Sequence, residues 1–153
     1  MVIIRRKLNG VTAKALATFM TAAKRAAGVR GEVCVLVTSS DEVRGLNRDF
    51  RRKDKPTDVL SFPAQADGLA GDIAISGDIA KENARALRHS ALTEVKILTL
   101  HGLLHLAGHD HEKDNGEMAK LEAKLRAKFD LPRGLIERTE KPRAKARSAR
   151  SGR

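Results

Sequence analysis

The chain has 153 residues, of which 41% are hydrophobic and 32% charged, and this composition is typical of one soluble globular domain. It excludes a disordered or collagen-like chain, and no apolar run approaches the ~18 residues that a membrane span requires. The N-terminal segment lacks the apolar region of a secretory signal, and a single cysteine, Cys34, permits no internal disulfide. We therefore expect a cytoplasmic protein without a membrane anchor.

The formal net charge of +11 is spread unevenly along the chain. Residues 138–153 hold seven basic residues and one acidic residue, a net charge of +6, which leaves +5 for residues 1–137. Because residues 138–153 include no aliphatic side chain larger than alanine, we expect a folded domain over 1–137 and a flexible basic arm over 138–153. Such arms usually contact nucleic-acid phosphates, and a merely solubilising terminus is the alternative.

Aromatic residues are scarce, with no Trp, no Tyr and four Phe. Phe19, Phe50, Phe62 and Phe129 each stand beside apolar neighbours, so we expect them in the core and not as stacking platforms for bases. If the chain binds RNA, this composition predicts contacts that are made mainly to the phosphate backbone.

The first half of the chain alternates between strand and helix patterns. Residues 2–8 and 32–37 read as strands, and the second of these is apolar enough to be buried on both faces. Helical spacing predicts a helix from Thr12 to Gly28, and the pair Ser39 and Glu42 predicts a capped helix that ends near residue 49.

The second half begins with a charged loop at 51–55 and continues with strands over 58–62 and 72–76. Three helices follow, over 78–88, over 92–107, and over a last segment that contains Met118 and Leu125. This order predicts a single α+β domain with a mixed sheet of about four strands and about five helices.

Four of the five histidines lie within residues 101–111. His101 and His105 are four residues apart in an apolar helical segment, so both imidazoles lie on one face of the helix, one turn apart. Gly108 can adopt a positive φ and turn the chain sharply, which can bring His111 back as a third ligand. Burying two imidazoles without a partner is costly, so the pattern favours a metal site over core histidines.

Three imidazoles without a thiolate are typical of a catalytic zinc site, with one ion per chain and a position left for water. The spacing also matches the metzincin proteases, but Gly102 stands where those enzymes carry the general-base glutamate. His109 and Asp110 are candidates for proton transfer or for contacts to the ligands. His89 stands alone in a charged stretch, and we expect it to be exposed.

Three segments resemble the YbeY-type endoribonucleases, the bacterial rRNA maturation factor family: LNRDFRRKDKPTDVLSFP (46–63), GDIAIS (71–76) and HGLLHLAGHDH (101–111). The resemblance spans about residues 40–120. It implies a zincin-like metal-hydrolase arrangement with zinc bound by His101, His105 and His111. It also implies a single-strand-acting RNase that helps to mature the 3′ end of 16S rRNA on the small ribosomal subunit and takes part in ribosome quality control.

The resemblance further implies that Arg51 is the basic residue of the RNA cleft. A guanidinium suits this role because it holds a phosphate with two donors and offsets charge that develops on phosphorus. The family usually has Tyr where this chain has His109, and we take His109 as a second candidate catalytic residue. Two alternatives stay open at this point: another metal hydrolase such as a peptidase, and a non-catalytic ribosome-assembly factor with structural zinc.

Overall fold

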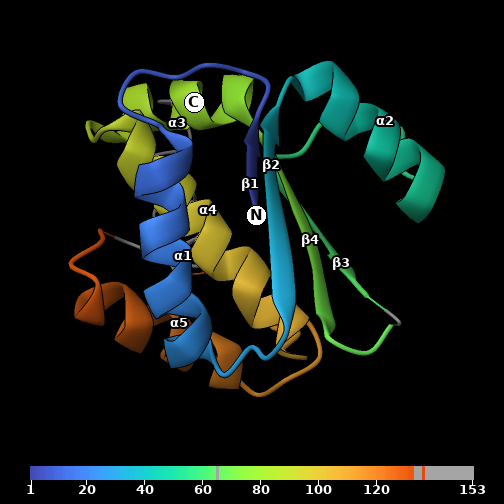
Figure 1. Cartoon of the computed structure of the whole chain (residues 1–153), viewed down its shortest axis with the longest axis vertical. Helices are drawn as coiled ribbons and strands as arrows, with labels where there is room; N and C mark the ends of the chain where they lie inside the picture. The colour runs from blue at the N-terminus through green and yellow to red at the C-terminus, as the bar shows by residue number, and fades with distance from the viewer. Residues whose placement is uncertain (65, 133–135, 137–153) are drawn as a thin grey trace, which may run out of the picture.

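One mixed sheet organises the molecule, and its strand order is β1-β2-β4-β3 in the computed structural model (Figure 1). The structure describes residues 1–64, 66–132 and 136. Within them the strands are β1 (Val2–Ile4), β2 (Glu32–Thr38), β3 (Val59–Pro63) and β4 (Leu69–Ser76). β1, β2 and β4 run parallel, whereas β3 pairs antiparallel with β4 and forms an edge of the sheet.

Five helices accompany the sheet in the described residues: α1 (Ala13–Ala27), α2 (Ser40–Arg51), α3 (Gly77–Leu87), α4 (Ala91–Leu106) and α5 (Glu117–Lys128). The first four start at Thr12, Ser39, Ser76 and Ser90, whose side-chain oxygens each accept a backbone N–H of the first turn. The predicted α+β class is therefore confirmed, and so are both helix starts that the sequence indicated by Thr12 and Ser39.

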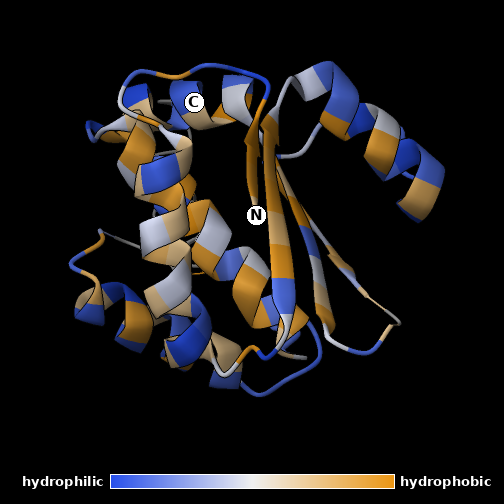
Figure 2. Cartoon of the chain, in the orientation of Figure 1, coloured by the Kyte–Doolittle hydropathy of each residue, from blue (hydrophilic) through white to orange (hydrophobic). Residues whose placement is uncertain are grey.

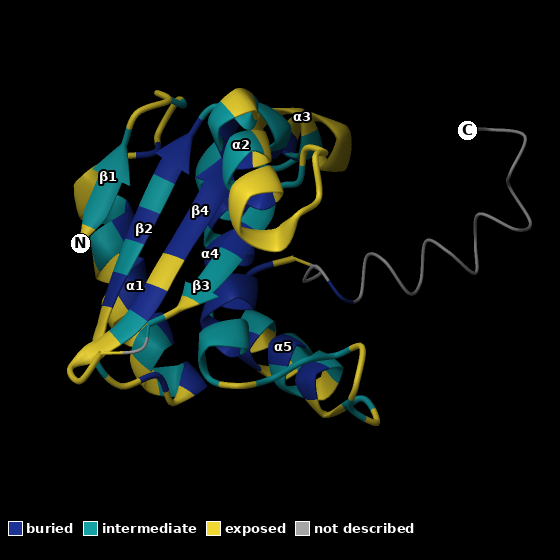
Figure 3. Cartoon of the chain, turned by 90° about the vertical axis from the view of Figure 1, so that its right-hand side faces the viewer, coloured by how far each residue is buried: buried dark blue, intermediate teal, exposed yellow. Residues whose placement is uncertain are grey.

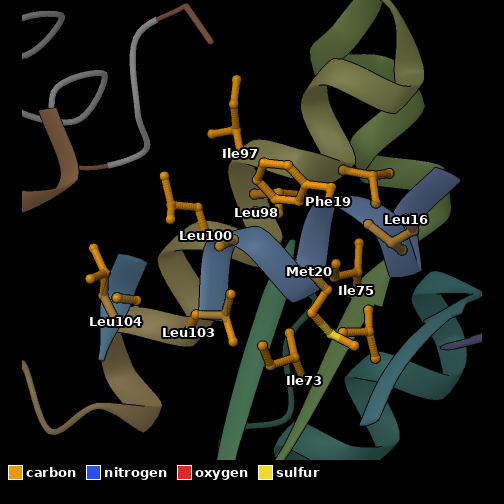
Figure 4. Packing of buried hydrophobic residues seen from close by; sticks show 14 of the residues in the cluster. Leu16, Phe19, Met20, Ile73, Ile75, Ile97, Leu98, Leu100, Leu103 and Leu104 are labelled. Carbon is orange, nitrogen blue, oxygen red and sulfur yellow. The ribbon is translucent and has the colours of Figure 1, made fainter. Parts of the chain in front are cut away.

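Helices α1 and α4 cover one face of the sheet, and α2 lies on the other (Figure 1). Where α1 packs against the sheet, the facing sides of α1 and β2 are largely hydrophobic (Figure 2). Leu16 of α1, Ile73 of β4 and Leu98 of α4 are completely buried there, within the cluster drawn in Figure 4. Burying each such side chain stabilises the fold by about 2 kcal/mol, so α4 is fixed firmly over the sheet.

Strand β2 is covered on one face only, which corrects the prediction that it is buried on both. Val33, Val35 and Val37 are buried under the helices, whereas Cys34 and Leu36 point to the opposite face and are half-buried. Figure 3 shows this less covered face beside α2. The reason is that α2 packs over only part of the face, through a small cluster built on Val43, Leu60 and Ala74.

The first strand is shorter than the predicted segment 2–8, because it ends at Ile4. The arginines that follow it are exposed and form ion pairs at 2.7 Å with carboxylates of neighbouring helices: Arg5 with Glu42 and Arg6 with Asp78. The predicted basic arm, 138–153, lies outside the described residues, and the domain boundary at 137 stays a prediction. None of the helices in the described ranges is long and apolar enough to cross a membrane.

Two side chains differ from the sequence-based expectation in their exposure. His89 was expected to be exposed, but only 14% of its side chain is accessible, and its Nε2 lies 2.8 Å from a carboxylate oxygen of the fully buried Glu94. A buried carboxylate needs a polar partner, which the ring provides. Phe50 was expected in the core and is instead 70% exposed, at the last turn of α2. The core expectation holds for Phe19, which is 8% exposed and contacts Phe129 edge to face.

Candidate metal centre and its cleft

The C-terminal end of α4 brings together the three histidines that the sequence predicts as ligands. His101 and His105 lie one turn apart, with their Nε2 atoms 3.2 Å from each other. The helix ends at Leu106, and Gly108 then turns the chain with a φ of 100°. This turn places the ring of His111 at 6.0 Å and 6.2 Å, centroid to centroid, from those of His101 and His105. One ligand nitrogen from each ring lies within 4.8 Å of the other two.

The protonation chemistry of this cluster fits a divalent metal ion. Burial lowers the pKa of His105, and the neighbouring His101 and His111 lower it further, so its imidazole is held in the neutral form that binds metals. The Nδ1 atom of His111 is buried and has no hydrogen-bond partner among the described residues. Three clustered imidazoles that include an unsatisfied buried nitrogen are costly by themselves and are suited to a shared cation.

A buried carboxylate that the sequence analysis missed orients the first of these histidines. Glu122 of α5 is 1% exposed, and its Oε2 lies 2.7 Å from Nδ1 of His101. Its Oε1 accepts the backbone N–H of Ile136 at 2.7 Å. Since a carboxylate accepts hydrogen bonds, this contact favours the tautomer of His101 with its proton on Nδ1, which leaves Nε2 free to face the other histidines. The sequence feature that could have identified Glu122 is its position on the apolar stripe of α5, between the buried residues Met118 and Leu125.

The loop that carries His111 is anchored by Asp114. The two carboxylate oxygens of Asp114 accept the backbone N–H groups of Gly116, at 2.8 Å, and Met118, at 2.9 Å. These hydrogen bonds lower the pKa of the Asp114 carboxyl. Since α5 begins after Gly116, which offers no side chain for capping, Asp114 supplies the cap and ties the histidine loop to the start of α5.

The histidines open into a cleft of about 720 Å³ that also contains the predicted basic residue. Arg51 is the last residue of α2 and lines this cleft together with Lys53 and Lys55. The segment after α2 is held in place by Asn47, which is 3% exposed and donates its side-chain N–H to the carbonyl oxygen of Lys55 at 2.9 Å. The ion pairs found among the described residues use other basic side chains, so these three cations are available to an anionic ligand.

The segment that follows α4 also lines the cleft. His109 and Asp110 are half-buried and line the cleft beside the metal-site histidines. The structure thus places all five predicted site residues, Arg51 and the four histidines of residues 101–111, around one cavity. The roles of Arg51 and His109 in a reaction stay predictions.

The packing of α4 on the sheet explains why residue 102 is a glycine. A Cβ atom at Gly102 would lie 3.0 Å from two carbon atoms of Ile73 and 3.0 Å from Oγ of Ser61. Ser61 also donates a hydrogen bond to the carbonyl oxygen of Gly102 at 3.2 Å. A glutamate at this position, which a metzincin peptidase carries, would require Ile73 and Ser61 to move, and its absence removes the general base of that class, so the peptidase alternative loses support.

An α+β fold in which a buried helix ends in three clustered histidines, beside a cleft whose cations form no ion pair with the described residues, is the arrangement of a metal-binding hydrolase suited to anionic substrates. The chain belongs to the YbeY endoribonuclease family, because the family model described as "Endoribonuclease YbeY" matches residues 2–130. The expected resemblance is thereby confirmed, together with the enzyme class, a nuclease that hydrolyses RNA.

Individual relatives cover most of the chain. An "Endoribonuclease YbeY" of Koribacter versatilis is 66% identical over 146 residues, which span 95% of this chain and 96% of that protein. Its namesake from Solibacter usitatus is 57% identical over 105 residues, which span 69% and 71% of the two chains. The solution structure of TM1509 from Thermotoga maritima matches with a TM-score of 0.57 and 33% identity, covering 81% of this chain and 85% of that one.

Proposed function

We propose that this protein is a zinc-dependent endoribonuclease that cleaves single-stranded RNA in the cytoplasm. The observation that carries the proposal is the convergence of three histidine nitrogens, within 4.8 Å of one another, on the cleft that also contains Arg51. Family membership supports RNA as the substrate. It also supports a finer assignment to maturation of the 16S rRNA 3′ end and to ribosome quality control, with the small ribosomal subunit as partner.

His101, His105 and His111 are the residues that would hold the zinc ion. When bound, zinc supplies Lewis-acid activation of a phosphoryl oxygen and lowers the pKa of water at its open position. Glu122 would keep the Nε2 lone pair of His101 available to the ion, because a carboxylate beside Nδ1 favours the ring proton on that atom. His101 is buried at the end of α4, and His105 and His111 are half-buried, so the ligand side of the cleft is partly shielded from bulk solvent. Electrostatic interactions are stronger there than in water.

The substrate binds to the basic wall of the cleft, which consists of Arg51, Lys53 and Lys55. The guanidinium of Arg51 holds the phosphate at the point of cleavage and offsets the negative charge that grows on it. Lys53 and Lys55 extend the contact to neighbouring phosphates of the strand. His109 is the remaining imidazole of the cleft, and a proton moves through its ring nitrogen to or from the reacting oxygens.

The attacking group is either water or the 2′-hydroxyl of the RNA, and the product ends distinguish the two. Attack by the 2′-hydroxyl leaves a 2′,3′-cyclic phosphate, whereas attack by water leaves a linear phosphate. Analysis of these ends after digestion of a defined single-stranded RNA settles the nucleophile without any change to the protein.

Arg51→Ala tests the proposal against its alternatives. Loss of a donor to the transition-state charge lowers the cleavage rate by roughly 100-fold or more, while metal content and fold are unchanged. Arg48→Ala is the matched control, because Arg48 lies on the same helix and pairs with Asp49 at 3.0 Å. Full RNase activity in Arg51→Ala, or a wild type that cleaves casein and not RNA, would contradict the proposal and favour a peptidase. RNA binding by the metal-loaded protein without any cleavage would favour the assembly factor.

The assignment to 16S rRNA has its own test. Purified small subunits that carry a precursor 3′ end should be cut at that end faster than an unrelated single-stranded RNA of equal length. Equal rates on both substrates would contradict the finer assignment and leave the general RNase activity intact.

A further inference from the structure

Phe50 has an exposure that the fold does not explain. It is 70% exposed, whereas the other described aromatic residues are buried or half-buried. Leaving an aromatic ring in water forgoes roughly 2 kcal/mol of burial free energy. Other large hydrophobic side chains that are exposed, such as Leu69 and Leu87, belong to other elements of the fold, so Phe50 is not part of a broad apolar patch of α2.

The ring of Phe50 is held in a defined orientation. It contacts the ring of Phe62 edge to face, with centroids 5.7 Å apart and an interplanar angle of 66°. Phe62 belongs to β3 and packs against the small cluster under α2 that contains Val43 and Leu60. The contact with Phe62 therefore orients the ring of Phe50 while most of the ring surface stays exposed to solvent. This is the arrangement of a preorganised stacking surface.

The ring is close to the cleft residues in the chain but is not part of the cleft lining. Phe50 directly precedes Arg51, and Phe62 lies between Ser61 and Pro63. Arg51, Ser61 and Pro63 line the cleft, whereas the two phenylalanines pack together on the α2 side of β3. The next residues, Arg52 and Lys53, are exposed cations. An exposed aromatic ring beside a row of cations is the combination with which proteins bind single-stranded nucleic acids: the cations follow the backbone and the ring stacks on a base.

We propose that Phe50 is the stacking platform for an unpaired base of the RNA strand whose phosphates the basic wall of the cleft binds. The proposal rests on the proposed RNA substrate and adds a source of selectivity for it. A base in a duplex is already stacked and paired, so only a flexible single strand can offer its face to Phe50. A protein partner is disfavoured as the occupant, because one isolated ring supplies far less than the ~800 Å² per partner that a stable protein interface buries.

Fluorescence offers a direct test, since the chain has no Trp and no Tyr. Phe50→Trp introduces a sole indole at the proposed platform, and stacking of a base should quench its fluorescence when short single-stranded RNA is mixed in. An RNA of equal length and charge that contains abasic residues should leave the fluorescence unchanged. Leu87→Trp is the matched control, because Leu87 is 45% exposed on α3 and should not respond to either strand.

Affinity measurements complete the test. Phe50→Ala should bind the base-containing strand about tenfold more weakly than the wild type, and it should bind the abasic strand with unchanged affinity. Phe50→Tyr should restore binding of the base-containing strand. Unchanged affinity of Phe50→Ala for the base-containing strand, with RNA cleavage by the wild type intact, would overturn this inference alone and leave the proposed function standing. A wild type that neither binds nor cleaves RNA would overturn the proposed function and, with it, the inference.

Discussion

Replacing Glu122 by glutamine tests whether the outer contacts of the histidine cluster control metal binding. In the native protein both carboxylate oxygens accept a hydrogen bond at 2.7 Å, one from His101 Nδ1 and one from the backbone N–H of Ile136. Glutamine has one accepting oxygen and one donating NH₂ group, so Glu122→Gln can satisfy only one of these donors. If the NH₂ group faces His101, the ring proton moves to Nε2, and this nitrogen no longer binds a metal.

The size of the effect follows from these contacts. Loss of a partner that orients a metal-bound histidine typically weakens metal affinity by about 10- to 100-fold. In the opposite orientation the NH₂ group faces the backbone N–H of Ile136, which leaves a buried donor unsatisfied and lowers the free energy of unfolding of the metal-free protein by about 1–3 kcal/mol. Both effects arise from the replacement of one oxygen atom by nitrogen, with the shape of the side chain nearly unchanged.

Competition with a chromophoric chelator measures the dissociation constant of the metal, and denaturant unfolding of the metal-free protein measures the stability. Glu117→Gln provides the control, because Glu117 is an exposed carboxylate in the first turn of the same helix. A metal affinity of Glu122→Gln equal to that of the wild type would refute the reasoning, since His101 would then keep its tautomer without the carboxylate.

Three further predictions concern acid stability, helix packing and the basic terminal segment. The pKa of His105 is lowered below its ordinary 6.5 in the folded state, so the unfolded chain binds the proton first. The metal-free protein should lose stability as the pH falls through about 6.5 in denaturant titrations, and a pH slope that persists in His105→Ala would contradict this cause. Gly102→Ala should lower the free energy of unfolding by about 1 kcal/mol through overpacking on Ile73, whereas Gly45→Ala, with only Arg48 at 3.6 Å, should raise it. Deletion of 138–153 should weaken RNA binding and flatten its salt dependence while cleavage at saturating substrate persists, and an inactive but folded truncation would contradict this.

Much of the fold and of the metal site follows from local patterns in the sequence. The i, i+4 spacing of His101 and His105 and the glycine at 108 depend only on helix geometry and on backbone freedom, so they predict the convergence with His111 correctly. The serine and threonine caps are likewise local, and Thr12 and Ser39 mark helix starts that the structure confirms.

Features that depend on contacts between distant segments were not predictable in this way. Glu122 lies 21 residues from His101, and only the packing of α5 beside α4 brings the two together. His89 is largely buried because its ring contacts the buried carboxylate of Glu94 in α4. The charged residues next to His89 in the sequence do not indicate this contact. Phe50 has apolar neighbours in space, but α2 covers only part of the sheet, and its last turn leaves the ring exposed.

The most direct test of the metal-dependent RNase is the rate of RNA cleavage measured against zinc content. Protein stripped with a chelator is titrated with zinc, and bound metal and cleavage of a single-stranded RNA are followed together. Activity should be absent at the start, rise in proportion to bound zinc, and level off at one equivalent per chain, while His105→Ala stays at background throughout. Full cleavage by the stripped protein, or by His105→Ala, would contradict the assignment of the three histidines to a catalytic metal site.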